Sequence, residues 1–352
     1  MPFRKGRHLA PMRRAVIPSF FFAATLFGQG QLPPRITFDL IGVNEGLPHA
    51  LVECFLEDDR GSLWVGMQQG LAVYDGNDFV SVDIEADGSP IGVRNLTKDG
   101  HGIIWVAAEQ GPVRVDPVSR HAQLVAIPDS LKQGVETLWA HAVIVTGPNE
   151  LLFGTHVGTF FLNTVTRTFR GLRYPDGAPV KTFWRDMLAD TVRHGIWITT
   201  HDRGLVFYHT ATGRLYVGEG DRAFSPLIAE KVVSLCHDGD GGLWCSYPRT
   251  GNIWHWDGTS SAVRAWDHVP GAPGTSLSTA WFLGRDRNGR IWGSASKPGG
   301  FRFDPKDGSA VVFDSEDLSA GSLPYGTIRN LYHSPSGEVW LANLLGIAIH
   351  DP

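Results

Sequence analysis

The fold of this chain is decided by residues 58–75, which read Asp58-Asp59-Arg60-Gly61-Ser62-Leu63-Trp64-Val65-Gly66-Met67-Gln68-Gln69-Gly70-Leu71-Ala72-Val73-Tyr74-Asp75. An acidic tight turn leads into a short strand that carries Trp64, and a glycine turn leads on to a second short strand. In such turns an Asp or Asn side chain accepts hydrogen bonds from nearby backbone amides, and glycine supplies the positive φ. The stretch therefore predicts a β-hairpin built around one tryptophan.

The spacing of this hairpin recurs along the chain. An acid, a glycine three residues later and a tryptophan three residues after that occur at Asp58/Gly61/Trp64, Asp99/Gly102/Trp105, Asp238/Gly241/Trp244 and Asp286/Gly289/Trp292. Weaker copies are centred on Trp340 (with Ser334 for the acid), on Trp197 (with Thr191 and His194 at the turn) and on Phe153. Successive aromatic residues lie 41, 48, 44, 47, 48 and 48 positions apart. This period is typical of β-propeller blades, so we expect an all-β, seven-bladed propeller of four-stranded antiparallel blades, with each aromatic ring wedged between blades.

The two ends of the repeat region predict how the ring closes. Blade seven has only three expected strands before Pro352, whereas residues 36–41 form an additional strand ahead of blade one. A propeller leaves no long sheet edge open. We therefore expect residues 36–41 to be the outer strand of blade seven.

Residues 1–30 have the pattern of a secretory signal peptide. Five basic residues precede an apolar run of about 14 residues, which is shorter than the roughly 20 that a membrane-spanning helix needs. We expect cleavage of this leader, a periplasmic or secreted protein with no transmembrane segment in the mature chain, and a single propeller domain over residues 31–352. The alternative is an uncleaved membrane anchor.

Charge and cysteine content exclude other classes of protein. Without the leader, 26 of the 31 basic residues remain against 36 acidic ones, which disfavours binding to nucleic acid or to an anionic membrane. Three cysteines, Cys54, Cys236 and Cys245, cannot all pair within one chain. Their positions in expected strands indicate buried reduced thiols rather than a disulfide framework.

The repeat resembles that of a known family. Gly46-Leu47-Pro48, then Glu57-Asp58-x-x-Gly61-x-Leu63-Trp64-Val65-Gly66, then Gly70-Leu71-x-x-Tyr74-Asp75-Gly76-x-x-Phe79 are similar to the two-component regulator propeller repeat. The resemblance covers residues 36–352. It implies an extracytoplasmic sensor domain, often for oligosaccharides, that acts through a membrane histidine kinase or further C-terminal signalling domains. A second propeller, a small β-sandwich, a membrane helix and a kinase, which such proteins often carry, are not encoded in these 352 residues.

The sequence contains none of the common catalytic motifs. Gly-x-Ser-x-Gly, His-Glu-x-x-His, Cys-x-x-Cys and the phosphate-binding Gly-Lys-Ser/Thr are all missing from it. Residues 238–242 resemble a calcium loop only in part, because the later carboxylate is lacking. We therefore expect no catalytic residues, no metal and no cofactor. The alternative is a propeller lyase or glycoside hydrolase acting on polysaccharide, which needs convergent carboxylates or a His–carboxylate pair at one mouth of the channel.

The candidate ligand site is the end of the central channel at which the innermost strands begin. Aromatic rings stack on sugars, and arginine or lysine binds hydroxyl and carboxylate groups. The residues of these types at the expected strand starts are His49, Arg94, Trp139, Trp184, Arg185, Lys231, Trp281, Tyr325 and Arg329. Because four of them are cations on an acidic protein, we expect an oligosaccharide ligand there, including an acidic one. The alternative is that the three tryptophans pack between blades.

Overall fold

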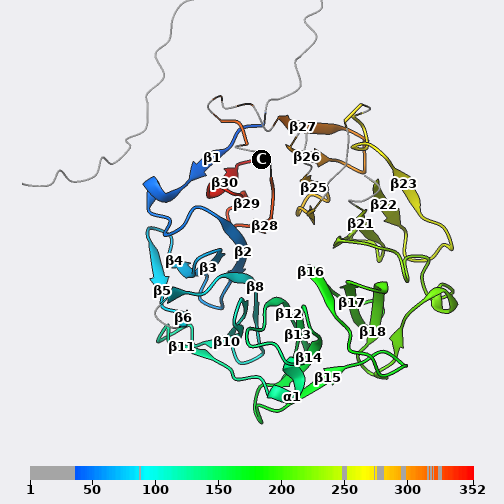
Figure 1. Cartoon of the computed structure of the whole chain (residues 1–352). Coiled ribbons are helices and arrows are strands. Elements are labelled where there is room, and N and C mark those ends of the chain that lie inside the picture. The colour runs from blue at the N-terminus through cyan, green and yellow to red at the C-terminus, as the bar shows by residue number, and fades with distance from the viewer. Residues whose placement is uncertain are drawn as a thin grey trace, which may run out of the picture. The chain divides into compact units, whose positions relative to one another are not determined.

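A ring of seven β-sheets is the main feature of the computed structural model, which describes residues 36–86, 89–247, 252–272, 274–275, 281–294, 299–314, 317, 319, 321–323 and 327–352 (Figure 1). In these residues each sheet has four antiparallel strands, and the sheets follow one another in chain order as blades one to seven. This architecture confirms the expected propeller. Residues 36–352 form one structural unit, and the predicted signal peptide lies outside the described residues.

In blades one to six the strands run outward from the channel in chain order, and in blade seven the last three described strands are followed outward by the first described strand. The inner strands, which contact one another around the ring, are β2 (Val52–Glu57), β8 (Val93–Lys98), β12 (Ala140–Gly147), β16 (Thr182–Asp190), β20 (Ser234–His237), β24 (Leu283–Arg285) and β28 (Asn330–His333). The second strands are β3 (Leu63–Met67), β9 (Ile104–Ala108), β13 (Glu150–Thr155), β17 (Gly195–Thr200), β21 (Leu243–Tyr247), β25 (Ile291–Ser294) and β29 (Val339–Ala342). The third strands are β4 (Leu71–Tyr74), β10 (Gly111–Val115), β14 (Thr159–Asn163), β18 (Gly204–His209), β22 (Asn252–Trp256), β26 (Gly299–Phe303) and β30 (Ile347–His350). The outer strands are β5 (Phe79–Val82), β11 (Ala122–Leu124), β15 (Phe169–Leu172), β19 (Leu215–Tyr216), β23 (Arg264–Trp266), β27 (Ala310–Asp314) and β1 (Asp39–Ile41).

Short elements join some of the blades. A small hairpin of β6 (Glu85–Ala86) and β7 (Ser89–Pro90) follows blade one, and helix α1 (Asp129–Lys132) precedes blade three. Two 3₁₀ turns span Val43–Glu45 and Glu219–Asp221. In the part of the chain that the structure describes, no helix has the length and apolar character needed to cross a bilayer.

Strand β1 closes the ring as expected. It pairs antiparallel with β30, with Asp39 opposite Ile349 and Ile41 opposite Ile347, so the first and last described strands share blade seven (Figure 1). The preceding Phe38 is buried against Trp292 of blade six, with ring centroids 6.4 Å apart. Closure thus combines backbone pairing with an aromatic contact to the neighbouring blade.

The repeated tryptophans fill the space between blades. Trp64, for example, packs in one cluster with Ile104 and Val106 of the next blade. All six repeat tryptophans are buried: Trp64, Trp105, Trp197, Trp244, Trp292 and Trp340. Burying a large flat ring between two twisted sheets removes much apolar area from water, which explains why the sequence repeats it.

In blade three, Leu152 and not Phe153 occupies the tryptophan position, which corrects the predicted alignment. Leu152 packs toward blade four with Ile196, whereas Phe153 faces back toward blade two and contacts Trp105. Successive residues of a strand point to opposite faces, so a shift of one residue reverses the side on which the ring packs. The aromatic residue was therefore the wrong marker for this blade.

In blades one, two and six the acid of the turn also binds the tryptophan of its own hairpin, whereas in blade five Asp238 binds His255. One oxygen of Asp58 accepts hydrogen bonds from the amides of Arg60 and Ser62, at 2.9 and 3.0 Å, and the other accepts the indole N–H of Trp64 at 2.9 Å. The same indole bond forms from Trp105 to Asp99 and from Trp292 to Asp286. The carboxylate thereby accepts hydrogen bonds from the backbone amides of the turn and from the indole N–H, which is the only polar group of the buried ring.

Two blades obtain this carboxylate from unexpected positions. In blade four the acceptor of the Trp197 indole is Asp190, at 2.9 Å, and His194 adopts the positive φ of 52° that glycine has elsewhere. Thr191, predicted at the turn position, is not the acceptor. In blade seven Glu338 accepts from Trp340 at 3.1 Å, while the Ser334 hydroxyl oxygen accepts from the Glu338 amide.

The three cysteines are buried and are not joined in disulfides, as predicted. Cys245 lies on β21 inside a hydrophobic cluster, and burial raises the pKa of its thiol well above the ordinary value. A buried thiol that stays protonated is a poor nucleophile, so Cys245 serves as a packing residue.

Candidate functional site

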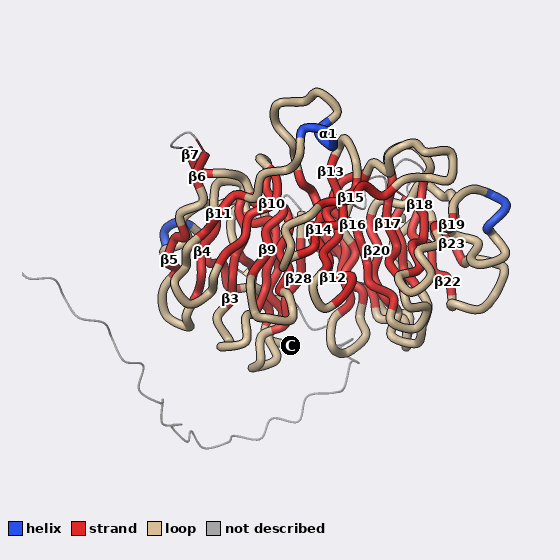
Figure 2. The backbone as a smooth tube through the Cα atoms, turned by 90° about the horizontal axis from the view of Figure 1, so that it is seen from below, coloured by secondary structure: helices blue, strands red, loops and turns tan. Residues whose placement is uncertain are grey.

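The candidate site lies on the side of the ring where the inner strands begin, which we name the mouth face. Because the strands of a blade are antiparallel, the turns between second and third strands and the links between blades lie on this face as well. Helix α1 and the β6–β7 hairpin mark it in Figure 2, and the acidic hairpin turns lie on the opposite face. The tryptophan-binding acids are thus separated from the mouth by the length of a strand.

A β-bulge at the start of the inner strand presents one side chain of a blade at the mouth. In blades one to three the strand register shifts by one residue, at Glu53, Arg94 and His141. An extra residue in one strand bends it locally and redirects the side chain. Each of these residues lies eleven positions before the residue that packs against the next blade, which is Trp64, Trp105 or Leu152. Val233, Trp281 and Arg329 hold the same position in blades five, six and seven.

The residues at this position in three successive blades form one ion cluster. Glu53 of blade one accepts hydrogen bonds from Arg94 of blade two at 2.9 Å and from Arg329 of blade seven at 2.8 and 3.0 Å. Arg94 also pairs with Glu109, from the turn after β9. The Glu53 side chain is 1% exposed, whereas those of Arg94 and Arg329 are 20% and 25% exposed. The cluster therefore has a buried carboxylate and two partly exposed guanidinium groups.

This pairing changes the charge balance expected from the sequence. Arg94 and Arg329 do meet near the channel axis, but Glu53 and Glu109 offset their charges within the protein. Two guanidinium groups and two carboxylates carry no net charge. A ligand at this cluster meets donors and acceptors side by side, so no anionic group is required to balance the site.

Two of the predicted tryptophans are exposed on the mouth face. Trp139 and Trp281 are 49% and 48% exposed, so neither is packed between blades. The Trp139 ring lies edge-on to His156, with centroids 6.5 Å apart, and His156 lies 6.4 Å from His141. Half-exposed indole rings at a channel mouth are suited to stacking on flat ligand surfaces.

The remaining predicted residues are placed less centrally or are not described. The His49 ring accepts a hydrogen bond from the Leu51 amide at 3.2 Å and is half-buried. Lys231 lines a cavity of about 450 Å³ at blade four, with Asp202 and Arg203, and does not join the Arg94 cluster. Tyr325 and the side chains of Trp184 and Arg185 lie outside the described residues.

Four residues of the mouth were missed by the sequence reasoning: Glu53, Glu109, His141 and His156. Glu53 carries a signal that could have found it, because it lies eleven positions before Trp64, as Arg94 does before Trp105. His141 lies eleven positions before Leu152, a residue that the sequence did not mark. The turn residues Glu109 and His156 have no comparable spacing. Among the described residues, no group of three His, Cys, Asp or Glu side chains is arranged to hold a metal ion.

Solved structures with the same fold are numerous, and they include extracellular domains from B. thetaiotaomicron. The extracellular domain of the hybrid two-component system BT4673 from B. thetaiotaomicron matches with a TM-score of 0.70 at 17% identity, over 90% of this chain and 40% of that one. The extracellular domain of BT3049 from the same organism matches with a TM-score of 0.70 at 16% identity, over 90% and 42%. This chain thus spans about two fifths of the length of these domains.

An enzyme shares the fold as well. Virginiamycin B lyase from Staphylococcus aureus matches with a TM-score of 0.67 at 10% identity, over 90% of this chain and 99% of that one. No protein-family model and no curated protein matches the sequence. At these identities the likeness establishes the propeller fold alone.

Proposed function

We propose that this chain is the ligand-binding propeller of an extracytoplasmic sensor, that it is not catalytic, and that its ligand is an oligosaccharide. The observation that carries the proposal is the mouth itself, where exposed Trp139 and Trp281 accompany the Glu53–Arg94–Arg329 cluster. Aromatic faces beside alternating charged donors and acceptors match the two kinds of surface that a sugar ring presents.

A neutral oligosaccharide fits this mouth better than an acidic one. Each arginine of the cluster already shares a carboxylate, so an added carboxylate of the ligand has to compete with Glu53 or Glu109. Sugar hydroxyl groups both donate and accept, and they can bind to the exposed edges of the ion pairs without breaking them. The preference for an acidic ligand, based on unpaired cations, is therefore replaced by a preference for neutral sugars.

Export and signalling belong to the same proposal. The leader over residues 1–30 fits secretion to the periplasm or beyond. Sensor domains of hybrid two-component systems share the fold, and this chain spans only part of their length. We infer that ligand occupancy is passed to a membrane histidine kinase or to further signalling domains. Mass spectrometry of the exported protein should find a new N-terminus after Gly28 or Gly30.

Calorimetry with neutral and uronic-acid oligosaccharides tests the ligand site. We expect binding of a neutral member of the panel, and loss of that binding when Trp139→Ala and Trp281→Ala are combined. The matched control is Val165→Ala, at a 66% exposed residue in the turn between β14 and β15 on the opposite face, which should leave affinity unchanged. A neutral sugar whose affinity ignores the double substitution would place the site elsewhere.

A polysaccharide lyase or glycoside hydrolase remains the second candidate, because two carboxylates and two imidazoles do meet at the mouth. Glu53 and Glu109 converge on Arg94, and His141 lies near His156. Both carboxylates are already hydrogen-bonded to guanidinium groups, however, so either one has to break an ion pair before it can act on a ligand. Recovery of the bound oligosaccharide unchanged after long incubation supports the sensor, whereas shortened or unsaturated products support the enzyme.

A further inference from the structure

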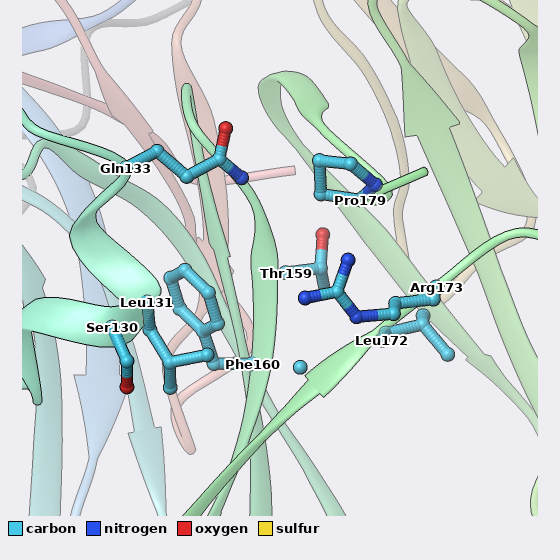
Figure 3. Close-up of a pocket in the computed structure, with 9 residues that line it drawn as sticks. Ser130, Leu131, Gln133, Thr159, Phe160, Leu172, Arg173 and Pro179 are labelled. Atoms are coloured by element: carbon cyan, nitrogen blue, oxygen red, sulfur yellow. The ribbon is translucent and has the colours of Figure 1, made fainter. Parts of the chain in front are cut away.

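A second cavity opens on the mouth face at the outer part of blade three, away from the ion cluster. Its volume is about 250 Å³, and its walls come from the α1 segment, the start of β14, the end of β15 and the link to blade four (Figure 3). The residues used below are Leu131, Gln133, Thr159, Phe160, Arg173 and Pro179. Pockets for drug-sized ligands occupy about 300–1,000 Å³, so this cavity suits a molecule of one ring.

One side of the cavity is apolar and firmly packed. Phe160 is buried in a cluster with Leu138 and Val157, and Leu131 packs against the same cluster. Pro179 forms the wall across from them in Figure 3. This side offers a flat, preformed surface for the body of a small ligand.

The other side is polar, and its charge is a single arginine. The Arg173 guanidinium lies beside Thr159 in Figure 3, and it donates one hydrogen bond, to the Gly177 carbonyl at 2.8 Å. Among the described residues no carboxylate pairs with Arg173, whereas Arg170 pairs with Glu150 at 3.0 Å. A guanidinium has five N–H donors in a planar fork, so Arg173 keeps donors for a carboxylate.

One further polar group favours a hydroxylated ligand. The Gln133 side chain is exposed; its amide nitrogen donates to the Val157 carbonyl at 2.9 Å, which holds the side chain at the rim and leaves its amide oxygen as an acceptor. The Thr159 hydroxyl, by contrast, is buried and donates to the Val180 carbonyl at 2.8 Å, so it belongs to the wall of the cavity. A ligand with a carboxylate for Arg173 and a hydroxyl group for Gln133 uses both polar side chains.

The larger cavity at blade four provides a contrast. There Arg203 is paired with Asp176 at 2.5 Å, and Asp202 and Glu219 add further carboxylates around Lys231. That cavity has no surplus of positive charge, so an anion gains little from entering it. The unpaired arginine distinguishes the blade-three cavity from this neighbour.

We propose that the blade-three cavity binds a small hydroxylated monocarboxylate of one-ring size, such as a sugar acid. Its carboxylate pairs with Arg173, and its ring lies against Phe160, Leu131 and Pro179. This site is separate from the channel mouth and does not rest on the sensor function.

Titration with glucuronate and with glucose, followed by NMR or calorimetry, tests the proposal. Glucuronate should bind and glucose should bind at least about tenfold more weakly, because glucose lacks the charge-assisted bonds to Arg173. Arg173→Gln should reduce the glucuronate affinity by about tenfold or more and make the two sugars equal. Arg170→Gln, at a neighbouring arginine that does not line the cavity, is the matched control and should leave the affinity unchanged.

A cavity-filling variant provides a second test that leaves the charge intact. Gly171 lies opposite Phe160 in the sheet, and a Cβ added there meets Leu131 at 3.7 Å, which is ordinary contact. Gly171→Val should therefore fold, with a melting temperature close to that of the parent, and should block glucuronate. The Trp139→Ala, Trp281→Ala double variant should still bind glucuronate, which separates this site from the channel mouth.

Three results would overturn the proposal: no binding of glucuronate, equal binding of glucose, or glucuronate binding that is unaffected by both Arg173→Gln and Gly171→Val.

Discussion

Asp286 illustrates how much one residue contributes to a blade. One of its oxygens accepts hydrogen bonds from the amides of Asn288 and Arg290, and the other accepts from the Arg290 side chain and the Trp292 indole. Burial alone raises the pKa of this carboxyl, but the Trp292 and Arg290 hydrogen bonds outweigh burial and hold the pKa below the ordinary 3.8. The ionised form is therefore the one that the fold binds.

The same direction applies to other turn acids. Burial raises the pKa of Asp190, but hydrogen bonds from Arg193 and Trp197 lower it by more, so that it also ends below the ordinary value. The Trp340 indole N–H lowers the pKa of Glu338. A carboxyl whose pKa is lowered on folding stabilises the folded state at any pH above its pKa in the unfolded chain, which is about 4. This stabilisation is lost as the pH falls through the pKa of the folded state. The propeller should therefore be sensitive to acid and not to mild alkali through these groups.

Asp286→Asn tests this linkage. The free energy of unfolding of the variant should be about 1–3 kcal/mol lower at neutral pH. Asn has one accepting oxygen where Asp has two, so it cannot accept from Trp292 and the Arg290 side chain as well as from the turn amides. Its stability should also fall less steeply than that of the parent between about pH 6 and about pH 3, since one depressed carboxyl is gone. Chemical unfolding at several pH values measures both effects. Asp59→Asn, at an exposed acid, is the control, and parallel pH profiles for the parent and Asp286→Asn would contradict the linkage.

At the scale of the element, the closing segment joins chain ends that lie far apart in sequence. Strand β1 contributes backbone pairing to β30, and Phe38 contributes burial against Trp292 and Phe313, with ring centroids 6.4 and 5.3 Å away. Leu40, on the same strand, is 39% exposed. The aromatic contact and the strand pairing can therefore be tested separately.

Phe38→Ala should destabilise the propeller by about 3–5 kcal/mol, the usual range for emptying a large buried ring. Leu40→Ala should change stability by less than about 1 kcal/mol, because its side chain already meets water. Deletion of residues 36–41 should lower the melting temperature more than either substitution, since it opens the ring at blade seven. A melting curve that the deletion leaves unchanged would show that β1 does not close the ring in solution.

At the scale of the whole molecule, Glu53 connects three blades around the channel. Its carboxylate holds Arg94, 41 residues away in sequence, and Arg329, 276 residues away. The cluster therefore combines the proposed ligand site with ring closure, because blades seven, one and two meet at one buried charge. A ligand that contacts either guanidinium group acts on this junction.

Glu53→Ala should cost about 3–5 kcal/mol, since it leaves two guanidinium groups close together without their shared carboxylate. Glu53→Gln keeps the shape and should cost less. Glu53→Ala combined with Arg329→Ala should be less destabilising than the sum of the two single variants, because the second change removes the uncompensated cation. Urea unfolding of the four proteins measures the coupling, and strict additivity would show that the pair contributes nothing to stability.

The sequence by itself determined the fold because the features that specify a blade are local. The acid–glycine–tryptophan spacing specifies a turn and the face of the strand that follows, and the period of this spacing predicted seven blades. The missing fourth strand of blade seven then assigned residues 36–41 to that blade. Local spacing failed where the turn changed length, as at Asp190, and where Leu152 replaced the aromatic residue. In both places a neighbour one position away had the right orientation, because strand side chains alternate between faces.

The tertiary structure alone decided what the mouth of the channel contains. Arg94, Trp281 and Arg329 were identified from the sequence as residues at strand starts, but their partner Glu53 was not. Whether a cation is free or paired depends on contacts between blades, and such contacts join residues that no local pattern relates. Arg173 was not a candidate at all, because its cavity forms only where the α1 segment, two strands of blade three and the link to blade four meet. Whether an arginine is available to a ligand depends on which groups of the protein lie within hydrogen-bond distance of it, and only the closed ring brings those groups together.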